Sequence, residues 1–374
     1  MKVEGRWRRA IERTGEGAVI ILDQAQLPYA IAWLTLADVH EAARAIRDMH
    51  VRGAPLIGAT AAHGIALAMR ADPSDAGLAA AYQELLATRP TAINLRWALD
   101  TMRAELTGEA PSARAELAAR SAARICDDDA AQCEAIGHHG LAVIRAVARP
   151  DRPVNILTHC NAGWLATVDW GTAIAPIYKA HEAGLAVHVW VDETRPRNQG
   201  LLTAWELAQH GVPHTVIADN QGGHLMQHGQ VDLCLVGTDR TTRSGDVCNK
   251  IGTYLKALAA HDNGVPFYAA VPSPSIDWSI DAPGEIPIEE RHGDEVRYIR
   301  GRGADGAPAR VEVVDPASPV ANAAFDVTPH RLVTGLITER GTAPATRAGL
   351  ARVFPEHGPE HGPEHGPEHG PERA

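Results

Sequence analysis

Two residues of this sequence pair a reactive side chain with a position from which it could act. Cys160 comes just after the apolar run PVNIL, within THCNAGWLATVDWG (158–171), and Asp239 comes just after VDLCLVG. Both runs read as buried strands, and open parallel sheets carry their chemistry at the carboxyl ends of the strands. A thiol at that edge can serve as a base, and a buried carboxyl can serve as a general acid because burial raises its pKa.

Each of the two residues also has a plain structural interpretation. A free cysteine packs well as a small hydrophobe, and Asp239 could cap the next segment or pair with Arg240. We expect a helix N-terminus after Cys160, which would favour the thiolate. The other cysteines lie within apolar helical or strand runs and are interpreted as packing residues: Cys126, Cys133, Cys234 and Cys248.

Several basic and amide residues adjoin small residues in a way that suits a phosphate group. Arg52 precedes Gly-Ala, whose backbone amides could approach an anion, and Arg89 lies at the end of a helical pattern. Gln199 lies at a helix start, and Asn249-Lys250 is expected to open another helix. Singly, each is an ordinary surface or capping residue. Together they indicate a soluble α/β enzyme that acts on a small phosphorylated metabolite.

The composition argues against several classes of partner. The 374 residues are 45% hydrophobic and 22% charged, as in ordinary globular proteins, and the formal net charge of −11 disfavours nucleic acid and anionic membranes. No stretch approaches the ~20 uninterrupted apolar residues of a membrane helix. The first residues lack the apolar core of a signal peptide, and the five cysteines form no C-x-x-C pair. Reduced thiols and a cytoplasmic location are therefore expected.

The chain reads as two units, so the predicted fold class is α/β. Residues 1–148 hold short strands within 17–36 and then helical patterns, which indicates a helical domain with a small antiparallel sheet. In residues 149–350, near-continuous apolar runs alternate with helical patterns, which is typical of a doubly wound parallel sheet. The five clearest runs are 154–157, 185–191, 214–218, 231–236 and 266–271.

Two further features are not expected to carry a site. Residues 351–374 end in a PEHG repeat without apolar residues, which predicts a disordered tail whose histidines bind metal weakly at most. Gly301–Gly306 matches G-x-G-x-x-G, but a strand-like run follows where a dinucleotide site needs a helix, so we interpret it as a hairpin and set NAD aside. His159 adjoins Cys160, yet no zinc-like grouping is evident, and no metal or cofactor is expected.

Five longer stretches resemble the methylthioribose-1-phosphate isomerase family of the methionine salvage pathway. They are VRGAPLIGATAAHGIALA, RPTAINLRWALD, THCNAGWLATVDWGTAIAPIY, DETRPRNQGLLTAWEL and GTDRTTRSGDVCNKIGTY. The wider superfamily also holds ribose-1,5-bisphosphate isomerase and regulatory subunits of the eukaryotic initiation-factor-two exchange factor. A related sugar-phosphate isomerase and a non-catalytic regulatory subunit therefore stay open as alternatives.

The resemblance implies a helical N-terminal domain, a Rossmann-like C-terminal domain and a homodimer. It implies isomerisation of 5-methylthioribose 1-phosphate to 5-methylthioribulose 1-phosphate without a metal or a nicotinamide. The family's catalytic cysteine falls on Cys160 and its catalytic aspartate on Asp239. Its substrate-binding positions fall on Arg52, Gly53, Ala54, Arg89, Gln199, Asn249 and Lys250. All are present, which favours an active enzyme over a regulatory relative.

The chemistry of such a substrate accounts for an acid beside a thiol. A sugar phosphorylated at its anomeric carbon cannot open its ring as a free hemiacetal does, so we expect protonated Asp239 to assist opening at the ring oxygen. Cys160 would then serve the C1–C2 hydrogen transfer, as a base or by stabilising charge during a hydride shift. Trp164 replaces the small residue of many family members, which makes 5-deoxyribose 1-phosphate a further expected substrate.

Overall fold

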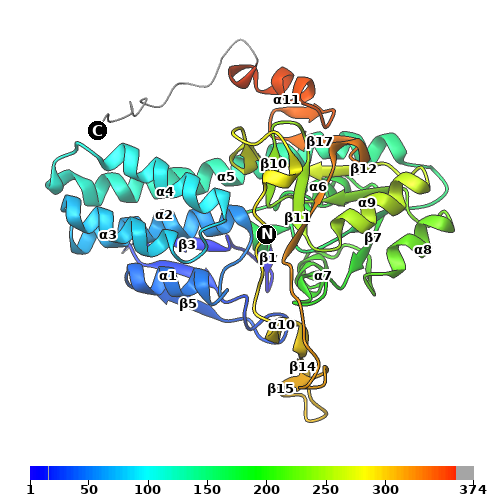
Figure 1. The fold of residues 1–374 in the computed structure, drawn as a ribbon, viewed down its shortest axis with the longest axis horizontal. Helices are drawn as coiled ribbons and strands as arrows, with labels where there is room; N and C mark the ends of the chain where they lie inside the picture. The colour runs from blue at the N-terminus through cyan, green and yellow to red at the C-terminus, as the bar shows by residue number, and fades with distance from the viewer. Residues whose placement is uncertain (16, 359–374) are drawn as a thin grey trace, which may run out of the picture.

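The computed structural model describes residues 1–15 and 17–358. The first unit begins with two small antiparallel sheets, β1 (Lys2–Val3) with β2 (Arg6–Trp7), and β3 (Ile11–Arg13), β4 (Val19–Leu22) and β5 (Trp33–Leu36). Helices follow, as the sequence predicted: α1 (Val39–Arg47), α2 (Ala54–Ala71), α3 (Asp75–Leu86), α4 (Ile93–Leu106) and α5 (Pro111–Val147). In Figure 1 these helices lie together on one side of the molecule.

The second unit contains a seven-stranded sheet in the order β18-β17-β12-β9-β6-β7-β8. Six strands are parallel, and β18 is antiparallel at one edge. Numbered along the chain, the parallel strands have the 3-2-1-4-5-6 order of a Rossmann fold, which confirms the predicted fold class. All five predicted apolar runs are strands of this sheet. The strands are β6 (Val154–Thr158), β7 (Val187–Asp192), β8 (His214–Ile217), β9 (Leu233–Val236), β12 (Phe267–Ala270), β17 (Gly335–Thr338) and β18 (Gly341–Ala343).

The sheet separates two hydrophobic clusters because its side chains alternate between faces. Ile156 of β6 packs with the N-terminal helices, whereas its neighbour Leu157 packs on the opposite face with Phe267 and Leu336. α5 packs against α2, α6 and β17, so the helical unit and one face of the sheet share a core. The crossover helices are α6 (Ala175–Glu182), α7 (Gln199–His210), α8 (Gln221–Gln227) and α9 (Thr253–Asp262).

A second sheet follows β9 and corrects one expectation. Its order is β13 (Ile276–Asp277), β10 (Arg240–Thr242), β11 (Val247–Lys250) and β16 (Phe325–Thr328). Asn249 and Lys250 were expected to open a helix, and that is wrong: they end strand β11, where they pair with β16. The helix α9 starts only after Gly252, whose φ of 101° turns the chain.

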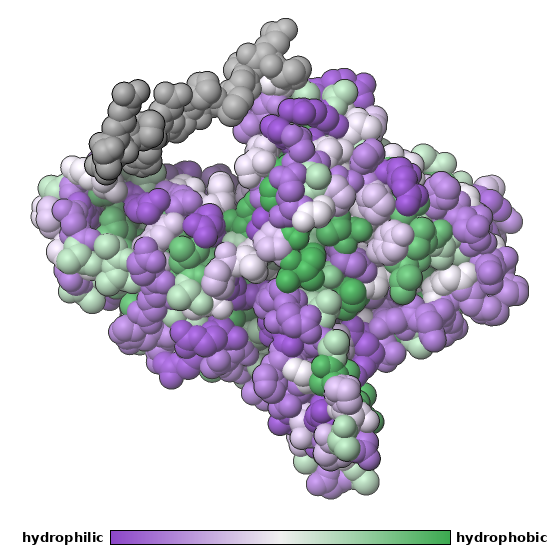
Figure 2. All heavy atoms as spheres, in the orientation of Figure 1, coloured by the Kyte–Doolittle hydropathy of each residue, from purple (hydrophilic) through white to green (hydrophobic). Residues whose placement is uncertain are grey.

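The expected hairpin at Gly301–Gly306 is present as β14 (Tyr298–Arg302) and β15 (Pro308–Glu312), directly after α10 (Asp294–Arg297). It projects from the body of the molecule (Figure 1). Figure 2 shows that most of the visible face is hydrophilic, with apolar patches near its centre. No helix in the two described ranges is both long and apolar enough to cross a bilayer.

The C-terminal boundary lies later than the sequence indicated. The helix α11 (Arg347–Val353) and a 3₁₀ turn (Pro355–His357) extend beyond residue 351, where a disordered tail was expected to begin. The reason is that Phe354 is buried against Trp278, whose ring also stacks on His357 at 4.0 Å. The rest of the predicted tail, residues 359–374, lies outside the described residues.

Candidate active site

Cys160 lies in the first loop after β6, in a conformation that the surrounding residues hold in place. Its φ of 67° is left-handed, which costs a non-glycine residue ~1–2 kcal/mol. The backbone N–H of Cys160 donates to Thr194 Oγ1 at 2.9 Å, and its carbonyl accepts from Thr203 Oγ1 at 2.8 Å. Loops after β6 and β7 and the helix α7 thus fix the position of the thiol.

Asp239 lies in the loop after β9, immediately before β10. Gly237 lies against the Cys160 loop so closely that a Cβ there would be 2.5 Å from Ala162 Cβ. The backbone N–H of Asp239 donates to the carbonyl of Cys248 at 2.9 Å, which ties it to β11. β6 and β9 are neighbours in the sheet, and the strand order reverses between them. Cys160 and Asp239 therefore lie at the topological switch point, where open α/β sheets bind ligands.

Burial and the neighbouring cations act in opposite directions on the pKa of both residues. Burial raises the pKa of the Asp239 carboxyl above its ordinary value, against the opposing effect of Lys250, Arg89 and Arg52. Burial likewise raises the pKa of the Cys160 thiol, although Arg52 and Lys250 oppose this. The helix N-terminus that was expected directly after Cys160 is wrong: only a 3₁₀ turn (Trp164–Ala166) follows it, and the next α-helix begins at Ala175. The support that such a helix would give to a thiolate is therefore missing.

Arg52 enters the site at the start of α2. Gly53 is the N-cap of that helix with a φ of 88°, and a Cβ on it would lie 2.4 Å from Ala166 Cα, so the Cys160 loop packs directly on the helix start. The guanidinium of Arg52 donates to both Asn161 Oδ1 and the Asn161 carbonyl, the latter at 2.8 Å. Burial lowers the pKa of Arg52, while the charges of Cys160 and Asp239 raise it.

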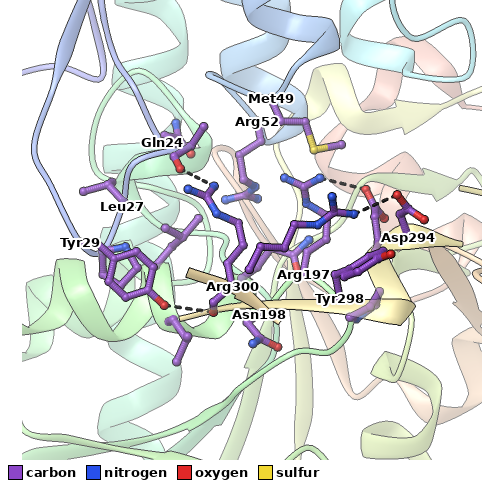
Figure 3. Close-up of a pocket in the computed structure, with 18 residues that line it drawn as sticks. Gln24, Leu27, Tyr29, Met49, Arg52, Arg197, Asn198, Asp294, Tyr298 and Arg300 are labelled. Carbon is purple, nitrogen blue, oxygen red and sulfur yellow. Dashed lines mark hydrogen bonds and ion pairs between the residues drawn. The ribbon is translucent and has the colours of Figure 1, made fainter. Parts of the chain in front are cut away.

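Two cavities open beside this helix start. One, of about 260 Å³, is lined by Arg52 and Gln199 among others, and Figure 3 shows Gln24, Tyr29, Met49, Arg197 and Arg300 around it. The second is smaller and more enclosed, and is lined by Ala54, Arg89 and Asp239. The first cavity thus brings together the sequence candidates Arg52 and Gln199, and the second brings together Ala54, Arg89 and Asp239. The start of α2 contributes one residue to each.

The remaining sequence candidates line neither of these two cavities: Cys160, Gly53, Asn249 and Lys250. Lys250 is close enough to Cys160 and Asp239 for their charges to raise its pKa, although burial lowers it, and its Nζ donates to the Ala324 carbonyl at 3.0 Å. Asn249 faces the other side of β11, and its amide donates to Thr253 Oγ1 at 3.1 Å. Trp164 is fully buried and lines neither cavity; its indole N–H donates to the Arg8 carbonyl at 3.0 Å.

Three buried amide oxygens belong to residues that line the larger cavity. Gln24 Oε1, Asn198 Oδ1 and Gln199 Oε1 are buried and make no hydrogen bond within the described part of the chain. A buried acceptor without a donor is costly, and hydroxyl groups are suitable donors. The residues around this cavity therefore include unpaired amide acceptors as well as the guanidinium of Arg52.

Sequence reasoning missed a chain of ion pairs that crosses the site. Arg89 pairs with Glu289 at 2.8 Å, and Glu289 pairs with Arg291 at 2.7 Å. Glu295 then joins Arg291 to Arg197, at 2.7 and 2.9 Å. The charged run IEERHGDEVR (288–297) was the available signal, but a charge run in a sequence is usually a solvated surface. This series of ion pairs connects the helical unit to the start of α7.

The residues around His159 form a hydrogen-bonded cluster with a lysine rather than a second reactive centre. His159, Asp192 and Asp219 have donor atoms within 4.8 Å of one another, as a metal site would need. However, Lys256 Nζ lies 3.2 Å from Asp192 Oδ2 and donates to the Asp219 carbonyl. His159 contacts Asp192 Oδ2 at 2.9 Å and the Ile251 carbonyl at 2.8 Å, so both ring nitrogens have hydrogen-bond partners. We therefore assign this cluster to holding the loops together.

Residues 50–345 match the initiation factor 2 subunit family. The chain is 63% identical over 359 residues to the methylthioribose-1-phosphate isomerase of Methylobacterium nodulans, covering 95% of this chain and 99% of that protein. It is 61% identical over 362 residues to the methylthioribose-1-phosphate isomerase of Rhizobium meliloti, and this match covers 95% of this chain and 100% of that protein.

Solved structures agree with these relatives. The crystal structure of 5-methylthioribose 1-phosphate isomerase from Pyrococcus horikoshii OT3 matches with a TM-score of 0.81 and 38% identity, over 94% of this chain and 96% of that one. Subunit delta of translation initiation factor eIF-2B from A. fulgidus matches with a TM-score of 0.78 and 36% identity, over 93% of this chain and 100% of that one. The resemblance inferred from the motifs is confirmed, and the chain belongs to the initiation factor 2 subunit family and, within it, to the methylthioribose-1-phosphate isomerases.

Proposed function

We propose that this protein is the aldose–ketose isomerase that converts 5-methylthioribose 1-phosphate to 5-methylthioribulose 1-phosphate in methionine salvage. The observation that carries the proposal is the pairing of Cys160 with Asp239 at the switch point of a chain 63% identical to a relative of that name. Regulatory relatives would need neither residue. We further propose a homodimer in the cytoplasm, and a division into two units near residue 148, between α5 and β6.

The substrate's phosphate is assigned to Arg52, Lys250 and the start of α2. The positive end of an 18-residue helix and its free backbone amides attract an anion, and Gly53 lets the chain approach closely. The buried amide oxygens of Gln24, Asn198 and Gln199 are suited to accept from the sugar hydroxyls. The arrangement holds both ends of a sugar phosphate before the chemistry starts.

Asp239 supplies the acid that ring opening needs. Its protonated carboxyl donates to the ring oxygen, the C1–O bond breaks with its electron pair staying on that oxygen, and positive charge develops at C1 beside the phosphoryl oxygen. In the hydride route, hydrogen then moves with its pair from C2 to C1, and Asp239, now a carboxylate, takes the proton of the C2 hydroxyl. The ketone forms and the acid is regenerated.

Cys160 has two possible roles that one isotope experiment separates. As a base, its thiolate would take the C2 proton and return it to C1; in the hydride route the sulfur only stabilises the cationic carbon. The raised pKa of the buried thiol supports the hydride route, because an uncharged thiol is a poor base. In deuterium oxide, product without deuterium at C1 supports the hydride shift, and product with deuterium at C1 supports the thiolate base.

Turnover of a panel of sugars tests the proposed function. The purified protein is assayed on 5-methylthioribose 1-phosphate, 5-deoxyribose 1-phosphate and ribose 1,5-bisphosphate. We expect the highest kcat/KM on the methylthio sugar and measurable turnover of the deoxy sugar. Absence of turnover on all three would overturn the proposal. A preference for the bisphosphate would reassign the substrate while keeping the reaction type.

A further inference from the structure

Glu206 is a fully buried carboxylate on the same face of α7 as the candidate residue Gln199. Gln199, Thr203 and Glu206 follow one another at i, i+4 and i+7, so the three side chains form one stripe along the helix. The stripe faces the Cys160 loop. Thr203 holds the Cys160 carbonyl, and Glu206 holds the next turn of that loop through the backbone N–H of Trp164 at 2.6 Å.

A continuous chain of hydrogen bonds joins Glu206 to Arg52. The side-chain amide of Asn161 donates to Glu206 Oε1 and to Thr203 Oγ1, the latter at 3.1 Å. The oxygen of the same amide accepts from Arg52. These partners define the amide's orientation, because turning it over would place its NH₂ against the guanidinium and its oxygen against the carboxylate.

Close packing leaves Glu206 no alternative position. A Cβ on Gly163 would lie only 2.1 Å from Glu206 Oε1, so the loop carries glycine where the carboxylate passes. Oε2 accepts from Tyr178 Oη at 3.0 Å as well as from Trp164. Both carboxylate oxygens therefore accept hydrogen bonds. Replacing either oxygen by a hydrogen-bond donor would leave a neighbouring N–H or O–H group unpaired.

We propose that Glu206 is a positioning residue for the substrate's phosphate: it fixes the Asn161 amide, which in turn orients the Arg52 guanidinium toward the bound sugar phosphate. The inference rests on the proposed function in assigning that anion to Arg52. It adds that the orientation of the anion-binding guanidinium depends on a carboxylate that does not touch the substrate.

The variant Glu206→Gln tests this relay, that is, the hydrogen bonds that run from Glu206 through the Asn161 amide to Arg52. Its amide has to present an NH₂ group either to Asn161, which turns that amide against Arg52, or to the Trp164 N–H. We expect the KM for 5-methylthioribose 1-phosphate to rise at least tenfold while kcat stays within about threefold. In an Arg52→Lys background the same substitution should change KM by less than twofold, because the relay already ends in a different side chain.

A matched control separates the relay from simple loop support. Asp129 is also a buried carboxylate that accepts from the same loop, at the Val168 N–H (2.7 Å), but it makes no bond to Asn161. Asp129→Asn should leave KM within twofold. If Glu206→Gln does not fold, Asn161→Ala cuts the relay while leaving Glu206 its bonds to Trp164 and Tyr178, and the same KM rise is expected. An unchanged KM, or effects of Glu206→Gln and Arg52→Lys that multiply fully, would overturn the inference.

Crystal structures of the wild type and the Glu206→Gln variant test the relay without turnover. We expect the Arg52 guanidinium to leave its hydrogen bond with Asn161 Oδ1 in the variant. An unmoved guanidinium would overturn the inference even if the enzyme is active. Inactivity of the wild type on the sugar would instead overturn the proposed function and leave the relay standing.

Discussion

Cys160 and Asp239 follow two strands, β6 and β9, that are neighbours in the sheet although β7 and β8 lie between them in sequence. The strand order reverses at this point, and open α/β sheets bind ligands at such a reversal. One loop supplies a thiol and the other a carboxyl, and both reach the start of α2. The proposed chemistry depends on this relationship.

The raised pKa of Asp239 sets the direction of the pH dependence of catalysis. In the proposed mechanism the protonated carboxyl is the active form, so activity should be present below its pKa and lost as pH rises through it. kcat/KM should fall tenfold per pH unit on that alkaline limb. In Asp239→Asn, kcat should be about 10²- to 10⁴-fold lower and the limb should be absent. An unchanged limb in the variant would assign it to another group.

Burial of Cys160 predicts slow modification of the native protein. Because desolvation raises the pKa of this thiol and its side chain is only 6% exposed, iodoacetamide at pH 7 should react with it at least tenfold more slowly than with glutathione. All five cysteines are free and buried, so all five should react once the protein is unfolded in urea. Rapid labelling of Cys160 in the folded protein would indicate a thiolate and support the base route.

Gly53 is required both by backbone angle and by contact, and the two effects can be separated. Gly53→Ala places a Cβ 2.4 Å from Ala166 Cα and should lower the free energy of unfolding by about 2 to 4 kcal/mol and displace Arg52. Gly5 has a similar left-handed φ of 78° with open space around it, so Gly5→Ala should cost only about 1 kcal/mol. Urea unfolding of both variants measures the difference, and equal losses would contradict the close contact.

The way sequence reasoning succeeded and failed has a physical basis. The β-branched runs identified five strands of the parallel sheet because strands covered on both faces must be apolar along their length. Asn249 and Lys250 were misassigned because VCNK has no such signature and becomes a strand only by pairing with β16, whose partner residues lie more than seventy positions later in the chain. Tertiary pairing decided that segment, and local propensity did not.

The same distinction applies to the site. Cys160, Asp239 and Arg52 were predicted because each follows a readable element or motif. Glu206 and Glu289 were not, since their importance depends on which side chains they meet: Glu206 lies within an ordinary amphipathic helix, and Glu289 lies in a charge run. Trp164 was expected to affect the pocket, yet its indole packs into the core, which no local pattern indicates.

Asp129 makes the stability of the protein depend on pH. Burial raises its pKa from 3.8 to about 7, so between about pH 4 and pH 7 the folded state holds a proton that the unfolded state releases. The folded state therefore loses stability as pH rises through this window, by up to about 4 kcal/mol. Asp129→Asn should remove that loss. Between pH 5 and pH 8 the free energy of unfolding should therefore fall more in the wild type than in the variant. The same change in both would contradict the assignment.

The joint action of Cys160 and Asp239 is tested most directly by turnover of 5-methylthioribose 1-phosphate. Wild type, Cys160→Ser, Asp239→Asn and the double variant are compared after circular dichroism has shown that all four fold. Residues that act in one reaction step are not additive, so we expect each single variant to lose at least 10²-fold in kcat and the double variant to be little worse than the poorer single one. Near-normal turnover in folded Cys160→Ser or Asp239→Asn would contradict the account.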